Sequence, residues 1–176
     1  MTQRVFGVAG WKNSGKTTMT ERLVAELSGR GWTVATVKHA HHDADVDHEG
    51  TDSFRHRSAG AREVALVTGR RWALMHELRD EPEPSLGDIL GRLSPCDLVL
   101  VEGYKREPHA KLELRRRGAK EGTPLAPGDP SIVAVAADVA VAETGLPVFG
   151  LDDVVAIADF IERSTGLVAE PSAPVR

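Results

Sequence analysis

The chain has 176 residues, of which 27% are charged and 41% hydrophobic, and its formal net charge is −4. This length suits one domain with a substantial core, and the acidic balance disfavours a general nucleic-acid binder. Cys96 is the only cysteine, so no internal disulfide can form. No apolar run approaches the ~18 residues of a membrane-spanning helix. The sequence therefore predicts a cytoplasmic protein without nucleic-acid or membrane partners.

Apolar runs and amphipathic segments alternate along the chain. In chain order we predict a strand at 4–9, a helix from about Lys16 to Ser28, a strand at 32–37, a polar loop at 38–50, a short helix at 51–61, strands at 63–68 and 71–76, a short helix from Ser85 to Leu93, strands at 97–103, 111–115, 131–138 and 146–149, and a helix beginning at Asp152. Apolar strands interleaved with helices are typical of parallel sheets covered on both faces. The predicted fold is α/β, with a mostly parallel sheet and helices on both faces.

Three elements carry more specific expectations. The short connection between 63–68 and 71–76 predicts an antiparallel hairpin. Residues 111–115, KLELR, alternate polar and apolar side chains, which favours an edge strand. The last helix is expected to bury one face, formed by Val154, Val155, Ala158 and Ile161.

The segment GWKNSGKTT lies between the first predicted strand and the first predicted helix. Gly10, Gly15, Lys16 and Thr17 match the phosphate-loop pattern G-x-x-x-x-G-K-[ST] in the context that it requires. Backbone N–H groups of such a loop point at phosphate oxygens, Lys16 would reach the terminal phosphates, and the Thr17 hydroxyl would bind Mg²⁺. The predicted nucleotide-binding residues are Gly10, Trp11, Lys12, Asn13, Ser14, Gly15, Lys16, Thr17 and Thr18. We predict a single P-loop NTPase-like domain over residues 1–165 and a flexible tail at 166–176.

The predicted strand DLVLVEG, residues 97–103, is closed by an acid and a glycine, Glu102 and Gly103. Ligands of open α/β sheets lie at the carboxyl ends of the strands, so Glu102 is placed to bind the metal or to orient an attacking water. The alternative is an ordinary strand-end acid that faces solvent. We interpret Glu102 as a metal ligand and a catalytic residue.

The segment from Lys38 to Arg57 is unusually rich in histidine and aspartate. It contains His39, His41, His42, His48, Asp43, Asp45, Asp47 and Asp52. The aspartates can complete a Mg²⁺ shell or move a proton, the histidines can bind a transition metal, or the segment is a solvated polar loop. We favour the first interpretation, with Asp45 and Asp47 as metal ligands and Asp47 also as a catalytic residue.

The segments GWKNSGKTT, VKHAHHDADVDHEGTDSFRHRSAGA, RRWALM and LVLVEGYK together resemble the molybdopterin-guanine dinucleotide biosynthesis protein B (MobB) family, over about residues 4–160. The resemblance implies a P-loop α/β domain, generally a homodimer, that binds GTP with Mg²⁺ and hydrolyses it weakly. It also implies assistance to the guanylyltransferase that attaches GMP to molybdopterin. Thr51 stands where family members commonly have lysine, so we expect no phosphate or pterin contact from this position.

Two further features gain a meaning from the resemblance. Guanine presents two adjacent donors that one carboxylate can accept, and Asp138 at the end of the strand 131–138 is our predicted guanine-binding residue; a turn or helix cap is the alternative. The basic segment 115–120, RRRGAK, can attract a pterin phosphate or the partner enzyme, or be a solvated loop. The segment RWALM can form a dimer contact or fill a sheet.

The resulting hypothesis is a GTP-binding accessory protein of molybdenum cofactor biosynthesis, at most a weak GTPase. Its cofactors are GTP and Mg²⁺, and its partners are the guanylyltransferase, molybdopterin and a second copy of the chain. Two alternatives stay open. One is a metal-delivery GTPase that uses the histidines. The other is a P-loop kinase for a small metabolite, with Asp45 or Asp47 as the base.

Overall fold

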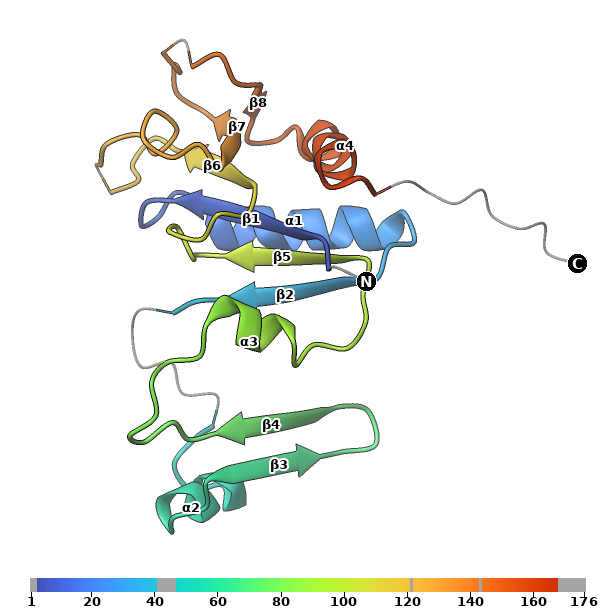
Figure 1. Cartoon of the computed structure of the whole chain (residues 1–176), viewed down its shortest axis with the longest axis vertical. Helices are drawn as coiled ribbons and strands as arrows, with labels where there is room; N and C mark the ends of the chain where they lie inside the picture. The colour runs from blue at the N-terminus through green and yellow to red at the C-terminus, as the bar shows by residue number, and fades with distance from the viewer. Residues whose placement is uncertain (1–2, 41–46, 121, 143, 168–176) are drawn as a thin grey trace, which may run out of the picture. The chain divides into compact units, whose positions relative to one another are not determined.

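The structure is a computed structural model that describes residues 3–40, 47–120, 122–142 and 144–167. The chain forms two compact units (Figure 1). Unit 1 comprises residues 1–39 and 88–176, and unit 2 comprises residues 40–87. The single P-loop domain over 1–165 stays a prediction, and most of the expected tail at 166–176 lies outside the described residues.

Unit 1 is built on a parallel sheet. In the described residues this sheet has six strands in the order β2-β5-β1-β6-β7-β8, and all its neighbouring strands pair in parallel. The strands are β1 (Val5–Gly10), β2 (Val34–Lys38), β5 (Leu98–Glu102), β6 (Lys111–Arg115), β7 (Ile132–Ala137) and β8 (Val148–Gly150). The expectation of a mostly parallel α/β sheet is confirmed.

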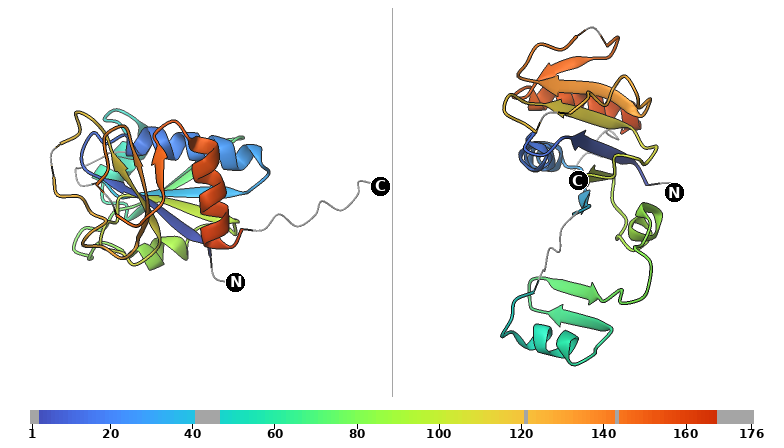
Figure 2. Two further views of the ribbon diagram at one scale, coloured as in Figure 1. Left: turned by 90° about the horizontal axis from the view of Figure 1, so that it is seen from above. Right: turned by 90° about the vertical axis from the view of Figure 1, so that its left-hand side faces the viewer.

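Helices α1 (Lys16–Gly29) and α4 (Val154–Thr165) form the main core with this sheet. Helix α1 contacts β1, β2, β5 and α4, and Figure 2 shows it along one face of the sheet. Helix α4 buries Val154, Ile157, Ala158 and Ile161, whereas Val155 is 59% exposed. The expected face was wrong by one residue, because the spacing i, i+3, i+4, i+7 from Val154 selects Ile157 and not Val155. The short helix α3 spans Leu86–Leu90.

Strand β6 is a central strand, and the expectation of an edge strand was wrong. It pairs with β1 on one side and with β7 on the other. Leu112 and Leu114 belong to the core cluster, while the alternate residues Lys111 and Glu113 are also fully buried. The polar alternation of KLELR therefore marks a buried polar layer on the face opposite the core, and not solvent.

Loops that follow β5 and β6 provide hydrogen-bond partners for the buried Lys111 and Glu113. Lys111 Nζ donates to the backbone oxygen of Glu107 and to Ser131 Oγ. Glu113 accepts hydrogen bonds from the backbone N–H groups of Leu125 (2.8 Å) and Ala126 (3.0 Å). Because a buried charge is tolerated only when it is hydrogen-bonded or paired, these contacts fix both loops on the sheet.

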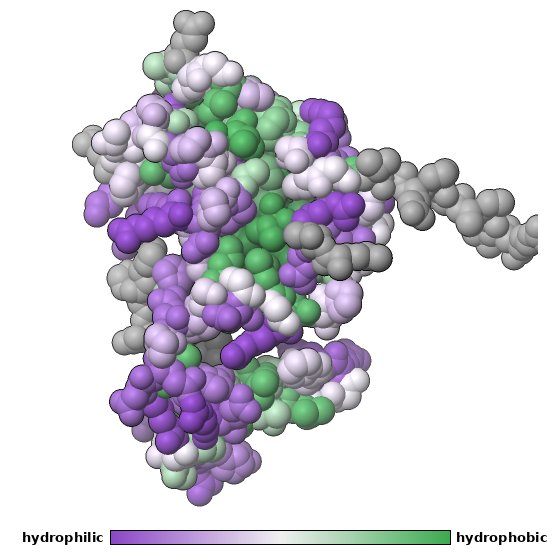
Figure 3. Space-filling view, viewed as in Figure 1, coloured by the Kyte–Doolittle hydropathy of each residue, from purple (hydrophilic) through white to green (hydrophobic). Residues whose placement is uncertain are grey.

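Unit 2 contains helix α2 (Asp52–Ser58) and an antiparallel hairpin of β3 (Glu63–Val67) and β4 (Trp72–His76), as predicted. The Thr51 side chain caps α2 by accepting from the backbone N–H of Phe54. Figure 3 shows green, hydrophobic surface over this hairpin. Four of its large apolar side chains are exposed. These residues are Leu66, Val67, Trp72 and Leu74.

A membrane-spanning helix would need a longer and more apolar segment than any helix in the described part of the chain provides.

Candidate functional site

The loop between β1 and α1 has the backbone geometry of a phosphate loop. Gly10 and Gly15 adopt positive φ angles of 148° and 89°, and a Cβ on Gly10 would lie 2.5 Å from Ser14 Oγ. Only glycine fits the Gly10 position without displacing Ser14. Gly15 is also the N-cap of α1, so the helix begins at Lys16 and its N-terminus faces the loop. Such an end offers unpaired N–H groups and a partial positive charge to an anion.

The three residues with predicted phosphate and metal roles lie together. Thr17 Oγ1 donates to Glu102 Oε1 at 3.0 Å, and these residues come from α1 and from the end of β5. Lys16 Nζ donates to the backbone oxygen of Trp11 at 2.8 Å, which places the ammonium over the loop. Glu102 is largely buried, so its carboxylate is directed at Thr17 and does not face bulk solvent.

The oxygen pair of Thr17 and Glu102 fits a Mg²⁺ ion. Adjacent ligands of an octahedral shell with metal–oxygen distances of 2.0–2.1 Å lie about 2.9 Å apart. The observed separation is 3.0 Å. In the described ranges no cluster of three or more histidine, cysteine or carboxylate residues can hold a metal. One hydroxyl and one carboxylate suit Mg²⁺, which takes its other ligands from phosphates and water.

Several cations surround this pair. Lys38 Nζ lies 3.5 Å from both Thr17 Oγ1 and Glu102 Oε1. Lys105 Nζ lies 4.1 Å from the centre of the Trp11 ring. Burial lowers the pKa of Lys16, the charges of Lys105 and Lys38 lower it further, and the carboxylate of Glu102 opposes the shift. A polyanion is the ligand that this concentration of positive charge favours.

Sequence reasoning missed Lys38 and Lys105, and it marked Arg116 only as part of the basic segment 115–120. Lys38 is the register partner of Glu102 in the β2–β5 pair, so a correct strand order would have found it. Arg116 lies over the loop, with Nη1 3.7 Å from the position of a Cβ on Gly15. Lys105 belongs to a loop far along the chain from the motif, and neither charge clustering nor periodicity marks it, whereas Arg116 lies in the basic segment RRRGAK.

Asp138 lines a pocket beside the phosphate loop. The pocket has a volume of about 310 Å³, and we call it the Asp138 pocket. The Asp138 carboxylate accepts from the backbone N–H of Arg117 at 2.7 Å, which fixes its orientation. The Asp138 pocket is lined by Ser14, Gly15, Thr18, Met19, Arg22, Leu114, Arg116, Asp138, Leu151 and Asp152.

Asp47 organises the start of α2 in unit 2. It is 7% exposed and accepts hydrogen bonds from Thr51 Oγ1 (2.7 Å), Ser53 Oγ (2.9 Å) and the backbone N–H of His48 (3.0 Å). Arg57 Nε donates to its other oxygen at 3.2 Å. The bond from Thr51 is the main reason that the pKa of Asp47 is lowered. These contacts explain the burial of Asp47 structurally, and its metal and catalytic roles stay predictions.

The remaining residues of the histidine and aspartate segment contribute less to the site. Asp45, His41 and His42 lie outside the described residues. The His39 ring lies against Tyr104, with ring centres 4.9 Å apart, and its backbone N–H donates to the backbone oxygen of Glu102. His39 therefore helps to fix the end of β5.

Comparisons with known proteins agree with this geometry. The sequence profile of the family "Molybdopterin guanine dinucleotide synthesis protein B" (MobB) matches residues 5–138. The molybdopterin-guanine dinucleotide biosynthesis adapter protein of Escherichia coli K12 is 40% identical over 159 residues, which cover 89% of this chain and 90% of that protein. The protein of the same name from Haemophilus influenzae is 39% identical over 162 residues, 90% of this chain and 88% of that protein.

Solved structures give the same result. The MobB homolog from Bacillus stearothermophilus matches with a TM-score of 0.68 and 29% identity, covering 94% of this chain and 100% of that chain. Bacillus subtilis MobB matches with a TM-score of 0.72 and 26% identity, covering 95% of this chain and 99% of that chain. With the phosphate loop, the Thr17–Glu102 pair and relatives across almost its whole length, the chain belongs to the MobB family of molybdopterin-guanine dinucleotide biosynthesis adapter proteins.

Proposed function

We propose that this adapter binds GTP with Mg²⁺ at the phosphate loop of unit 1. The observation that carries the proposal is the contact between Thr17 and Glu102, beside Lys16 at the start of α1. Lys16 binds the terminal phosphates, while Thr17 and Glu102 supply two ligands to the metal. Asp138 accepts the two adjacent donors of guanine in the Asp138 pocket, which distinguishes GTP from ATP.

The bound nucleotide serves a partner enzyme. The relatives are named as adapters of molybdopterin-guanine dinucleotide biosynthesis, and this wording supports a guanylyltransferase and molybdopterin as partners. The described site clamps phosphates with lysines and an N-terminal helix end, and we propose only weak Mg²⁺-dependent hydrolysis of GTP. The exposed apolar hairpin of unit 2 supports a homodimer, and we place the protein in the cytoplasm.

The comparisons favour the adapter over the two alternatives from the sequence. The family profile and the curated relatives name neither a metal-delivery GTPase nor a metabolite kinase. The histidines His41 and His42, on which the metal-delivery hypothesis depends, lie outside the described residues. We therefore carry only the adapter forward.

Calorimetric titration with GTP and ATP, each with and without Mg²⁺, tests the proposal. We expect GTP to bind more tightly than ATP and Mg²⁺ to strengthen the binding. Lys16→Ala should weaken GTP binding by about 1.5–3 kcal/mol, because it removes charge-assisted bonds to phosphate. Arg163→Ala is the matched control, since it removes an exposed cation of α4 that lies outside the phosphate loop and does not line the Asp138 pocket. Equal affinity of the wild-type protein and Lys16→Ala for GTP would contradict the proposal.

A further inference from the structure

A second pocket adjoins the phosphate loop. Its volume is about 330 Å³, and we call it the Arg115 pocket. Ser14, Leu114 and Arg116 line both this pocket and the Asp138 pocket, so the two pockets share a wall. Pockets from about 300 Å³ upward hold small molecules and cofactors. The second pocket is therefore large enough for a ligand of its own beside the nucleotide.

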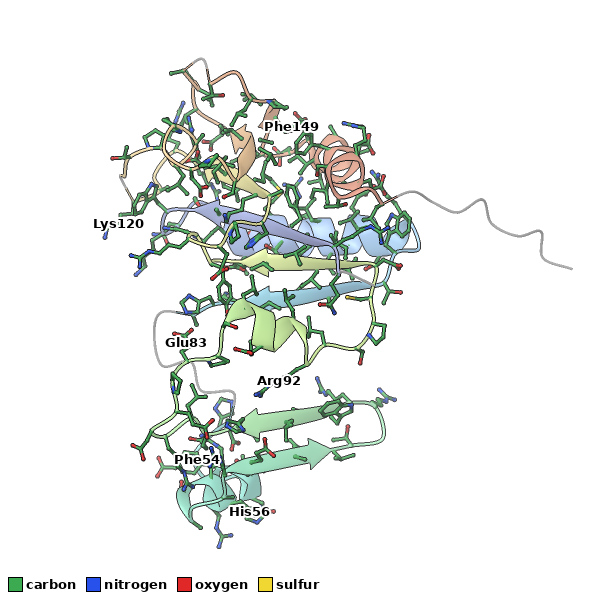
Figure 4. All side chains as sticks on the ribbon, viewed as in Figure 1. Phe54, His56, Glu83, Arg92, Lys120 and Phe149 are labelled. Atoms are coloured by element: carbon green, nitrogen blue, oxygen red, sulfur yellow. The ribbon has the colours of Figure 1, made fainter. Side chains whose placement is uncertain are left out.

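The polar groups of the Arg115 pocket leave it positively charged. Three cations line it: Arg115, Arg116 and Lys120, the last labelled in Figure 4 at the end of the sheet that carries the phosphate loop. The one described carboxylate in the lining, Glu113, accepts two backbone N–H bonds and pairs with Arg115 Nη2 at 2.7 Å. One acid thus faces three cations, which favours an anionic ligand.

Two buried polar atoms of the lining are unsatisfied. Arg115 Nε and Ser14 Oγ have no hydrogen-bond partner among the described residues. An unpaired buried donor costs about 1–3 kcal/mol, so such groups are commonly found where a ligand supplies the partner. Both side chains line the Arg115 pocket.

The remaining wall is apolar and attached to the phosphate loop. Trp11 Nε1 donates to the backbone oxygen of Thr123 at 3.0 Å, and Lys120 N–H donates to the backbone oxygen of Lys12 at 2.8 Å. A Cβ on Gly122 would lie 2.3 Å from the Trp11 ring, so the segment packs directly on the indole. A ligand in this pocket would therefore lie at a fixed position relative to the nucleotide phosphates.

We propose that the Arg115 pocket binds the acceptor of the guanylyl group, a planar heterocycle that carries a phosphate. Arg115, Arg116 and Lys120 bind the phosphate, because guanidinium groups match phosphate oxygens in geometry and charge. Leu114, Pro124 and Val139 provide apolar surface for the ring. This inference rests on the proposed function, in which GTP occupies the neighbouring site.

The test uses hydroxymethylpterin monophosphate as the probe and follows its own fluorescence during titration with the full chain at saturating GTP. We expect saturable binding that GTP does not displace. Val139→Glu places a negative charge in the pocket lining and should weaken probe binding by about tenfold or more, because like charges repel. GTP affinity, measured by calorimetry, should fall by a clearly smaller factor than probe affinity, because Val139 follows Asp138 in the chain but does not line the Asp138 pocket.

Val155→Glu is the matched control, because it makes the same substitution at an exposed position of α4 that lines neither pocket. It should change neither affinity. Displacement of the probe by GTP, equal probe affinity of Val139→Glu and wild type, or no binding of the probe to a protein that binds GTP would each overturn this inference and leave the nucleotide site intact. Failure of the wild-type protein to bind GTP would instead overturn the proposed function.

Discussion

Glu102 and Thr17 lie 85 positions apart in the chain, yet each was predictable from its own neighbourhood. Thr17 completes a motif, and Glu102 ends an apolar strand. Their 3.0 Å contact follows because β1 and β5 are parallel neighbours, so both residues reach the same edge of the sheet. Lys38 lies at the same edge, but its role requires the strand order β2-β5-β1, which side-chain patterns do not contain.

The charge of Glu102 should matter only when metal is present. Glu102→Gln keeps the shape of the side chain and removes the negative ligand, so Mg²⁺-dependent GTP hydrolysis should fall about tenfold or more. Metal-free nucleotide binding should persist. Phosphate release and calorimetry measure the two effects, and Glu107→Gln, a glutamate outside the Thr17 contact, is the control. An unaltered hydrolysis rate would show that Glu102 only ends the strand.

His109 is a second residue whose charge state is set by its surroundings. Burial and the neighbouring Lys111 ammonium lower its pKa to about 4. Neither ring nitrogen has a hydrogen-bond partner within the described residues, and a Cβ on Gly7 would lie 2.6 Å from Nε2. The folded protein therefore holds this imidazole neutral against the sheet.

Low pH should reduce the stability of unit 1, because the buried His109 resists protonation in the folded protein. Because the pKa is lower in the folded protein than the ordinary 6.5, the unfolded chain binds the proton more readily, and stability is lost as the pH falls from 6.5 towards 4. We expect the free energy of unfolding, measured by urea titration, to decline over this range. In His109→Leu the decline should be smaller, whereas His56→Leu, at an exposed position on α2, should retain it. Parallel pH profiles for His109→Leu and wild type would contradict the assignment.

At the scale of elements, the sequence predicted apolar strands well and polar ones poorly. The phosphate-loop strand and α1 lie within a few residues of their predicted bounds, because periodicity and glycine turns mark them locally. The position of β6 could not be predicted. The partners of its buried Lys111 and Glu113 are backbone groups of later loops, and such long-range contacts leave no trace in KLELR itself.

Helix α2 depends on a single cap. Thr51 Oγ1 accepts from the backbone N–H of Phe54 and donates to Asp47. Thr51→Ala should destabilise α2 by about 1 kcal/mol, a typical loss for a removed N-cap. Amide hydrogen exchange of the peptide 47–60 measures this change, and Thr51→Ser, which keeps the hydroxyl, should exchange nearly as slowly as wild type. Equal exchange in Thr51→Ala and wild type would exclude the cap as a source of stability.

At the scale of the whole molecule, the hairpin of β3 and β4 differs from an ordinary monomer surface because it exposes large apolar side chains. Val67 and Trp72 are register partners on β3 and β4, and they are 71% and 70% exposed. Contiguous exposed apolar side chains are typical of surfaces that bind another protein. This feature supports the proposed homodimer.

A charged residue among the exposed apolar side chains of the hairpin should dissociate the proposed homodimer. We expect Trp72→Asp to reduce the mass measured by light scattering from that of a dimer to that of a monomer, because burying a carboxylate in an apolar interface is costly. Val155→Asp adds the same charge on α4 and should leave the mass unchanged. A wild-type protein that is already monomeric at high concentration would refute the interface.

The buried Glu113 has a consequence for how the sequence can diverge. Its carboxylate holds the loop after β6 through the main-chain N–H groups of residues 125 and 126, and not through their side chains. Any amino acid other than proline supplies such a group. Substitutions at positions 125 and 126 therefore keep these two hydrogen bonds as long as the new residue is not proline. Replacement of Glu113 would remove both bonds and release the loop. The selective constraint falls on the strand, and the loop is left open to variation among relatives.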